Sequence, residues 1–299
     1  MNEINGKTRL FGFFAHPAQH SLSPLMYNVS FDELGLNARY LAFDIQPSEI
    51  KQAVQAIRTL NLAGANLSMP FKQAVIPLLD EITPRAHQLQ SVNVILNQAG
   101  RLIGDSVDGQ GFFESLTAQK IKFKKQRIAV LGVGGAGRSI IQAAINNQIS
   151  QIDVFKRKNE TFIQRKEQLH QLAKGSDTEV NLIDYEDQAK MKHSLARSHL
   201  VINTTNLGMG TKESQMPVAP DVLNVLDGNQ VVCDVIYSPR ETKFLRFAQQ
   251  RGCQTINGLG MLIHQGALSF KWWTNEAMPI NEVTQAINNQ LTQTKKAGI

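Results

Sequence analysis

Residues 128–137 read IAVLGVGGAG, an apolar run followed by glycines at three spaced positions. The run predicts a buried strand, and Ile141, Ile145 and Ile149 lie on one face of the helix expected after it. The first glycine would make a tight turn, the second would let the backbone approach a pyrophosphate, and the third would let the helix pack closely on the strand. The helix start adds free N–H groups that favour phosphate. We therefore predict dinucleotide binding, rather than a purely structural turn, at Gly132, Gly134, Gly135, Ala136 and Gly137.

The next strand, expected at residues 152–155, decides which dinucleotide fits. An acidic residue at its end would bind a ribose 2′-OH and repel a 2′-phosphate. Here the strand is followed by Lys156, Arg157 and Lys158, and cations suit a 2′-phosphate, which Arg can hold with two parallel hydrogen bonds. Asp153 precedes the strand end, so we assign it no contact with ribose. The sequence predicts NADP as the cofactor, with NAD as the alternative.

Further strand-like runs follow in the second half of the chain. They lie at residues 180–183, 200–203, 231–235 and 255–256, which with the two runs above makes six. Six strands alternating with helices are typical of a full doubly wound, Rossmann-type nucleotide-binding domain. A strongly apolar helix is expected at 259–273, and Met278-Pro279 should separate it from a last helix.

The first third of the chain also alternates strands with helices. Strands are expected at 10–14, 40–43, 65–69, 92–96 and 102–103, and Ser23 is expected to cap a helix that has Pro24 in its first position. Such alternation predicts an α/β unit with a mostly parallel sheet. The fold class is therefore α/β with two domains, as the length of 299 residues also suggests.

Composition limits the class of function. The chain has 31 Lys and Arg against 25 Asp and Glu, a net charge of +6, which suits anionic small molecules. Nucleic acid is the alternative, but the basic stretch at 120–127 has no recognition motif beside it and is better explained as a solvated linker. Two cysteines are too few for a disulfide framework or a structural zinc site. With no apolar signal core or membrane-length apolar run, the sequence predicts a cytoplasmic protein without membrane partner.

Three polar clusters in the first third are more than a plain sheet requires. One is HSLSP at residues 20–24, where hydroxyls at a helix start would suit a carboxylate. Another is GANLSMPFK at 64–72, which places Lys72 just past a strand end. The third is GDSVDG at 104–109, ahead of the second domain. Simple helix capping by Ser23 and a solvated surface lysine are the structural alternatives for the first two clusters.

With these clusters the chain resembles the shikimate dehydrogenase family, including its quinate/shikimate branch, over nearly its whole length. The resemblance also rests on SVN at 91–93, GQGF at 109–112, GVGGAG at 132–137, Asn203-Thr204-Thr205 with Gly208-Met209, and GLGMLIHQGA at 258–267. It implies a substrate-binding catalytic domain of residues 1–107 and 258–299, and an NADP-binding domain of residues 108–257. The C-terminal helices would return to the first domain, and a cleft would hold both ligands.

The resemblance also implies roles for individual residues. Lys72 and Asp108 would form the catalytic pair, in which the lysine can exchange a proton with the substrate oxygen and the aspartate can orient the lysine. The remaining implied contacts are Ser21 and Ser23 to a substrate carboxylate; Ser68, Asn93 and Gln265 to ring hydroxyls, with Tyr40 a further candidate; Tyr237 near both ligands; and Asn203, Thr204 and Met261 along the cofactor. No metal site is expected.

The implied activity is NADP-dependent, reversible reduction of 3-dehydroshikimate to shikimate in aromatic amino-acid (chorismate) biosynthesis, by a homodimer or a monomer. The pattern departs from the family where Val94 and Val107 replace threonines, where Phe71 replaces the asparagine usual in the quinate/shikimate branch, and where His264 replaces its tryptophan. Two alternatives therefore stay open. One is a quinate/shikimate dehydrogenase paralogue that uses NAD or NADP, and the other is a non-catalytic NADP-binding relative.

Overall fold

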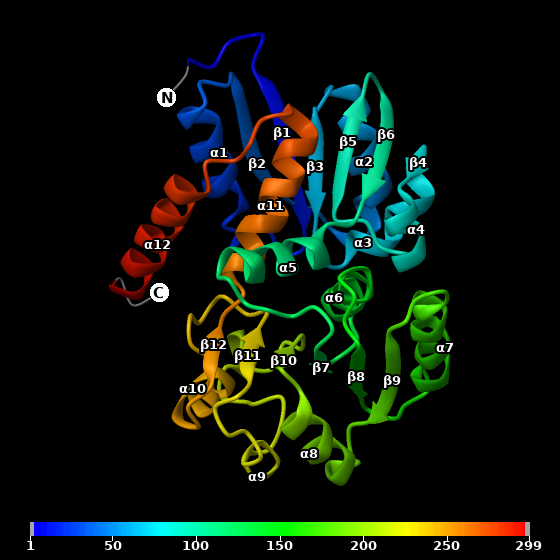
Figure 1. Ribbon diagram of the computed structural model, residues 1–299. Helices are drawn as coiled ribbons and strands as arrows, with labels where there is room; N and C mark the ends of the chain where they lie inside the picture. Colours follow the sequence, from blue (N-terminus) through cyan, green and yellow to red (C-terminus); the bar gives the residue numbers. More distant parts are fainter. Residues whose placement is uncertain (1–2, 297–299) are drawn as a thin grey trace. The chain divides into compact units, whose positions relative to one another are not determined.

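A computed structural model describes residues 3–296, which pack as two compact units (Figure 1). One unit runs to Val107 and resumes at Ile263, and the other spans Asp108–Leu262. Each unit contains a six-stranded sheet. Within the described residues, no helix is both long and apolar enough to cross a membrane.

The sheet of the first unit has the strand order β2-β1-β3-β5-β6-β4. Its strands are β1 (Arg9–Ala15), β2 (Ala38–Asp44), β3 (Gly64–Leu67), β4 (Glu81–Ile82), β5 (Val94–Gln98) and β6 (Arg101–Asp105). Strands β2, β1 and β3 are parallel, whereas β5 is antiparallel to both β3 and β6. A hairpin forms here because only Ala99 and Gly100, both with positive φ, join β5 to β6, and a parallel crossover needs a much longer connection.

Helices surround this sheet. They are α1 (Ser23–Glu33), α2 (Ile50–Thr59) after the short η1 (Pro47–Glu49), α3 (Phe71–Ala74), η2 (Ile76–Leu78), α4 (Pro84–Leu89) and, from the C-terminal end, α11 (Leu259–Thr274) and α12 (Ile280–Lys296). The expected return of the last helices is confirmed, because α12 packs on α1 and Trp273 of α11 donates from Nε1 to the oxygen of Ile95 at 2.9 Å. Trp273 fits against Gly64, where a Cβ would lie 2.4 Å from its ring nitrogen.

The expected capping of α1 by Ser23 is wrong. The N-cap is Leu22, and Ser23 is already the first helical residue. The hydroxyl that serves this helix end is that of Ser21, which accepts a hydrogen bond from the N–H of Ser23 at 3.2 Å. Because the first N–H groups of a helix have no partner within it, a neighbouring hydroxyl can take over the role of a cap.

All six strands expected in the second half of the chain are present, and all are parallel. They are β7 (Arg127–Leu131), β8 (Gln151–Lys156), β9 (Glu179–Asp184), β10 (Leu200–Asn203), β11 (Val231–Asp234) and β12 (Gln254–Ile256), in the order β12-β11-β10-β7-β8-β9. The order reverses between β7 and β10, and ligands of open α/β sheets bind outside the carboxyl ends of the strands at such a point.

Apolar clusters cover both faces of this second sheet. On one face, Phe112 and Leu116 of α5 (Asp108–Ala118) pack with Ile140 and Ile141 of α6 (Gly135–Asn146). Leu169 of α7 (Phe162–Ala173) belongs to the same cluster. The other face carries Leu195 of α8 (Gln188–Arg197), Val222 of α9 (Pro220–Leu223) and Phe244 of α10 (Lys243–Gln250), and η3 (Gly210–Lys212) lies in the loop after β10. These two layers hold the carboxyl edge of the sheet in place.

Helices α5 and α6 cross at a contact that only glycine permits. The N–H of Gly109 donates to the hydroxyl of Ser139 at 2.8 Å, and a Cβ on Gly109 would lie 1.9 Å from the carbonyl oxygen of Ser139. No flexible side chain can move aside here, because the obstacle is backbone. The close crossing places the start of α5, and with it Asp108, directly against α6.

We expect Gly109→Ala to lower the free energy of unfolding by about 3 kcal/mol, because the two helices must separate and their shared core must repack. Thermal unfolding of the ligand-free protein checks this. Gly135→Ala is the matched control, since Gly135 is helical and an added Cβ would have no heavy atom within 4 Å. That variant should be as stable as the wild type or slightly more stable. Equal effects of the two variants would contradict the close-packing argument.

Candidate functional site

The polar residues of the first unit gather at one edge of its sheet. Ser68 follows the end of β3, Asn93 precedes the start of antiparallel β5, and Asp105 closes β6. The register pairs Asn66 with Val94 and Val94 with Asp105, so these chain ends lie side by side. The topology of the sheet therefore brings together the residues next to these three strand ends.

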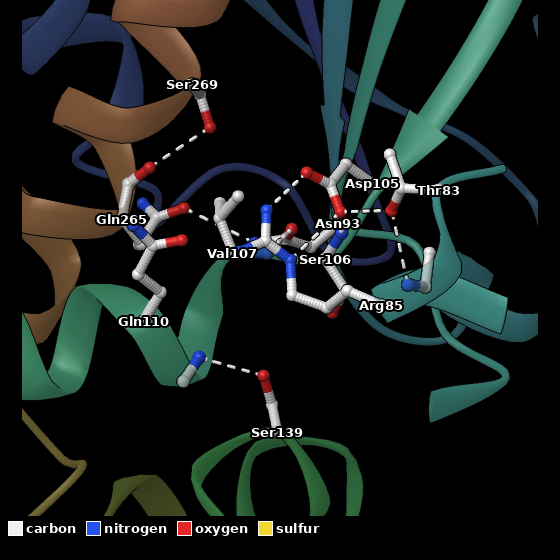
Figure 2. Close-up of polar contacts among 12 residues, drawn as sticks. Thr83, Arg85, Asn93, Asp105, Ser106, Val107, Gln110, Ser139, Gln265 and Ser269 are labelled. Atoms are coloured by element: carbon white, nitrogen blue, oxygen red, sulfur yellow. Dashed lines mark hydrogen bonds and ion pairs between the residues drawn. The ribbon is translucent and has the colours of Figure 1, made fainter. Parts of the chain in front are cut away.

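A buried hydrogen-bonded network connects two of the predicted substrate residues. The hydroxyl of Tyr40 donates to Oδ1 of Asn66 at 2.9 Å, and Nδ2 of Asn66 donates to the carbonyl of Asn93 and to Oγ of Ser269, both at 3.2 Å. Figure 2 shows the continuation, in which Oγ of Ser269 donates to the carbonyl of Gln265 and Nδ2 of Asn93 approaches Oε1 of Gln265 at 3.5 Å. The network fixes Asn93 and Gln265 relative to each other.

Tyr40 supports this network from within the core. It is fully buried, its ring stacks on Tyr27 at 4.4 Å, and its hydroxyl also bonds to Ser23. Burial first, and then the neighbouring Tyr27, raises the pKa of Tyr40 well above its ordinary value, so the hydroxyl stays protonated. Ser23 and Asn66 are thereby joined through a neutral donor.

Lys72 lies on α3, directly after β3. Phe71 is completely buried and anchors this short helix, while Lys72 is half-buried. The carbonyl of Lys72 accepts from the N–H of Val92 at 2.8 Å, which holds its backbone next to the segment that carries Asn93. Ser68 is held by its own N–H, which donates to the carbonyl of Phe14 at 3.0 Å.

Asp108 is the first residue of α5 and is 8% exposed. A helix N-terminus stabilises a carboxylate, because its free N–H groups carry partial positive charge. The preceding residue is tied to the first unit, since the N–H of Val107 donates to Oδ1 of Asn93 at 2.9 Å. Asn93 therefore contacts the chain immediately before Asp108 as well as Gln265.

The second unit contains a cavity of about 480 Å³ at the carboxyl ends of β7, β8 and β10. The glycine loop contributes Gly132 and Gly134, and the loop after β10 contributes Thr205 to Leu207. Four cations line the cavity, namely Lys156, Arg157, Arg165 and Lys212. Among the described lining residues there is no acidic group, so the cavity suits an anion.

Arg165 is the lining residue that sequence reasoning missed. It lies in the first turn of α7, and its Nε is buried without a hydrogen-bond partner within the described chain. Burial lowers the pKa values of Lys156 and Arg138, and the charge of Arg165 lowers them further. Burial also lowers the pKa of Arg165 itself. A cation in the first turn of a helix is unfavourable, because it lies at the positive end of the helix dipole. This unfavourable position is the sequence signal that could have indicated an anion-binding role for Arg165.

Other predicted cofactor residues lie elsewhere. Lys158 is exposed and stands apart from the cavity lining as described. Thr204 donates from its hydroxyl to the carbonyls of Leu131 and Gly132 at 3.0 and 3.1 Å, and thus holds the glycine loop. A Cβ on Gly137 would lie 2.7 Å from the Thr204 hydroxyl and from the carbonyl of Gly132, which explains the third glycine. Met261 packs in the core cluster beside α5 and α6.

Asn203 is fully buried and joins β10 to β11 through Asp234. Its Nδ2 donates to Oδ1 of Asp234 at 3.0 Å, and its Oδ1 accepts from the N–H and the hydroxyl of Thr205. Asp234 also accepts from the N–H of Ile236 at 3.1 Å and from the hydroxyl of Thr242 at 2.8 Å. One carboxylate thus holds both the loop that lines the cavity and the loop that leads to the half-buried Tyr237.

Comparison with known proteins agrees with this arrangement. The profile of the shikimate dehydrogenase substrate binding domain matches residues 13–95, and that of the shikimate 5'-dehydrogenase C-terminal domain matches residues 258–287. A shikimate dehydrogenase (NADP(+)) of Latilactobacillus sakei is 41% identical over 94% of this chain and 97% of its own length. One of Alkaliphilus metalliredigens is 41% identical over 95% of this chain and 98% of its own.

The chain belongs to the shikimate dehydrogenase family. A crystal structure of shikimate 5-dehydrogenase from Listeria monocytogenes, in complex with shikimate and NAD, superposes with a TM-score of 0.89 at 35% identity. It covers 96% of this chain and 99% of that one, so the whole fold is shared.

Two departures from the family pattern can now be placed. Val94 is fully buried inside the first sheet, and Val107 is 4% exposed. A threonine at either place would need a hydrogen-bond partner for its hydroxyl, whereas valine fills the same volume without one. Valine at these two positions therefore adds no buried hydroxyl to the sheet edge.

On the proposal that this cavity binds the 2′-phosphate of NADP, we expect Arg165→Ala and Arg157→Ala each to weaken NADPH binding about 10-fold or more, because each would remove a charge-assisted hydrogen bond to that phosphate. NADH binding should change by less than about 2-fold, since NADH lacks that phosphate. Fluorescence titration with the two nucleotides measures both values. Lys158→Ala is the matched control and should bind both nucleotides like the wild type. Equal losses for NADPH and NADH in the Arg165 variant would contradict its assignment to the 2′-phosphate.

Asp234 should make the stability of the second unit depend on pH. Burial raises the pKa of Asp234 from 3.8 to about 6, despite the three hydrogen bonds that lower it. The folded state therefore holds this proton more tightly than the unfolded state. The resulting stabilisation is fully present below about pH 4 and is lost as the pH rises through about 6.

Relative to Asp234→Asn, the wild type should therefore lose up to about 3 kcal/mol of unfolding free energy between pH 4 and pH 7. Urea unfolding of both proteins across this range measures the difference. Asp187→Asn is a control of opposite sign, because hydrogen bonds from the N–H and side chain of Lys190 lower the pKa of Asp187. A wild-type minus Asp234→Asn difference that stays constant with pH would contradict the titration of Asp234.

Proposed function

We propose that this protein catalyses the reversible, NADP-dependent reduction of 3-dehydroshikimate to shikimate. The single observation that carries the proposal is family membership at 41% identity over nearly the full chain, with relatives named shikimate dehydrogenase (NADP(+)). The retention of both Lys72 and Asp108 supports an active enzyme over a non-catalytic relative. The reaction belongs to aromatic amino-acid biosynthesis.

The residues of this chain would handle the oxygen of the reacting carbon. Bound NADPH supplies a hydride to the ketone carbon, which leaves negative charge developing on the oxygen. Lys72 donates a proton to that oxygen in reduction and accepts one in oxidation. Asp108 orients the ammonium group and accepts a hydrogen bond from a neighbouring hydroxyl.

The remaining polar groups would hold the substrate. Ser21 and Ser23, at the start of α1, bind the carboxylate, because a helix start and two hydroxyls offer donors to an anion. Ser68, Asn93 and Gln265 bind ring hydroxyls. The buried network behind Asn93 and Gln265 supports this assignment, since it fixes their amides before the substrate arrives. Tyr237 contacts the substrate near the nicotinamide.

NADP is the proposed cofactor. Positive charge beside the glycine loop comes from Lys156, Arg157 and Arg165. The described residues that line the cavity include no Asp or Glu that could bind the 2′-OH of an NAD ribose. NAD is the second candidate, because the similar Listeria enzyme was crystallised with NAD.

Both described cysteines, Cys233 and Cys253, are buried and unpaired, which agrees with the proposed cytoplasmic location. Homodimer and monomer are both compatible with the proposal.

Lys72→Ala should lower the turnover number with shikimate and NADP⁺ by about 100-fold or more, because general acid–base catalysis is lost. The same variant should bind NADPH with an unchanged dissociation constant, as measured by fluorescence titration. Initial rates of the wild type on shikimate and quinate, each with NADP⁺ and NAD⁺, separate the proposed activity from its quinate and NAD alternatives. A variant with the wild-type rate would refute the role of Lys72, and a wild type inactive on every combination would favour the non-catalytic relative.

A further inference from the structure

Asp105 is a buried carboxylate that the proposed reaction does not use. It closes β6 and is 7% exposed. Its Oδ1 accepts from the hydroxyl of Thr83 at 2.5 Å, from the N–H of Ser106 at 2.7 Å and from Nε of Arg85 at 3.1 Å. Its Oδ2 accepts a second hydrogen bond from the guanidinium of Arg85, so the ion pair is bidentate (Figure 2).

The partners of Asp105 are themselves fixed. Thr83 is the N-cap of α4 and accepts from the N–H of Ala86 at 3.2 Å, while its own N–H donates to the carbonyl of Gly104. Arg85 lies in the first turn of α4. The start of α4 is therefore attached to the last two residues of β6 by backbone, hydroxyl and guanidinium contacts together.

The chain that leaves Asp105 leads to the groups of the reaction. The carbonyl of Asp105 accepts from the N–H of Asn93 at 2.9 Å, and the side chain of Asn93 accepts from the N–H of Val107 at 2.9 Å. Asp108 follows immediately, and Gly109 is bound to Ser139. Residues 105–107 thus connect the proposed hydroxyl-binding Asn93 with the proposed catalytic Asp108.

We propose that Asp105, through its bidentate pair with Arg85, is a positioning residue that sets where Asn93 and Asp108 stand for the reaction. The proposal rests on the function proposed above. A carboxylate at a strand end could simply fasten a helix to a sheet. Its carbonyl, however, accepts from the N–H of Asn93, and residues 106–107 lead directly to Asp108. A shift of the Asp105 backbone would therefore displace both residues of the proposed site. A displacement of about 1 Å can cost a large factor in rate.

The same strand offers a matched control at its other end. Arg58 pairs with Oδ2 of Asp80 at 2.8 Å and donates to the carbonyl of Gly100, and Asp80 accepts from the N–H of Leu102. This pair also fastens a helix to β6, but it lies at the edge of the sheet away from Asn93. The side chain of Asp80 is 43% exposed, whereas that of Asp105 is 10% exposed.

The experiment compares Arg85→Ala, Arg85→Lys, Asp105→Asn and Arg58→Ala by steady-state kinetics with shikimate and NADP⁺, alongside thermal unfolding. We expect Arg85→Ala and Asp105→Asn to lower the turnover number about 10-fold or more and to raise the KM for shikimate, with the KM for NADP⁺ within about 2-fold of the wild type. Arg85→Lys should recover part of the lost rate. Arg58→Ala should lower stability without lowering the turnover number.

The outcomes separate the two proposals. An active wild type, together with Arg85→Ala or Asp105→Asn variants that keep the wild-type turnover number, would overturn the positioning role. If Arg85→Ala does not fold, Asp105→Asn decides, because it keeps the side-chain volume and an oxygen for Thr83 and Ser106. A wild type that binds NADPH but turns over none of the substrates would reject the proposed function itself, and the positioning role with it.

Discussion

The polar network of the first unit depends on the hydrogen bonds of one buried residue, Asn93. Its side chain joins Gln265 of α11 to the backbone of Val107, and its own backbone bonds to Leu67 and Asp105. At 2% exposure, Asn93 has no water to replace a lost partner. Segments far apart in sequence must therefore all be in place before the hydrogen bonds of Asn93 are complete. Such mutual dependence makes a polar network rigid and specific.

The nucleotide cavity is governed by the opposite kind of constraint. Burial lowers the pKa values of Arg138, Arg165 and Lys156, and repulsion by the charge of Arg165 lowers those of Arg138 and Lys156 further. Like charges held together in this way destabilise the ligand-free protein and favour any state in which an anion lies among them. The same arrangement gives a physical reason for the proposed preference for NADP over NAD. A dinucleotide without a 2′-phosphate would leave this repulsion uncompensated.

The sequence alone was enough to predict those features of the fold and of the site that depend on short-range patterns. The glycine loop, the six parallel strands and the basic strand end at Lys156 and Arg157 all follow from short-range pattern. It was insufficient where a contact depends on topology. Arg165 is one cation among several on α7, and nothing near Asp105 in sequence indicates Arg85 as its partner. The start of α1 was misjudged by one residue because Ser21 and Ser23 are equally good caps by type, and only geometry selects between them.

The two buried carboxylates at strand ends, Asp105 and Asp234, differ in whether a charged group donates hydrogen bonds to them. Asp105 faces a guanidinium, whereas the donors to Asp234 among the described residues, Asn203, Ile236 and Thr242, are uncharged. Neutral donors lower the pKa of Asp234 less than burial raises it, so this carboxyl can exchange a proton within the physiological range. A guanidinium keeps its charge at all such pH values, and removing it would leave a buried carboxylate unpaired, which is far more costly than losing one hydrogen bond. The end of β6 is thus held by an ion pair, while the end of β11 is held by a network of neutral donors.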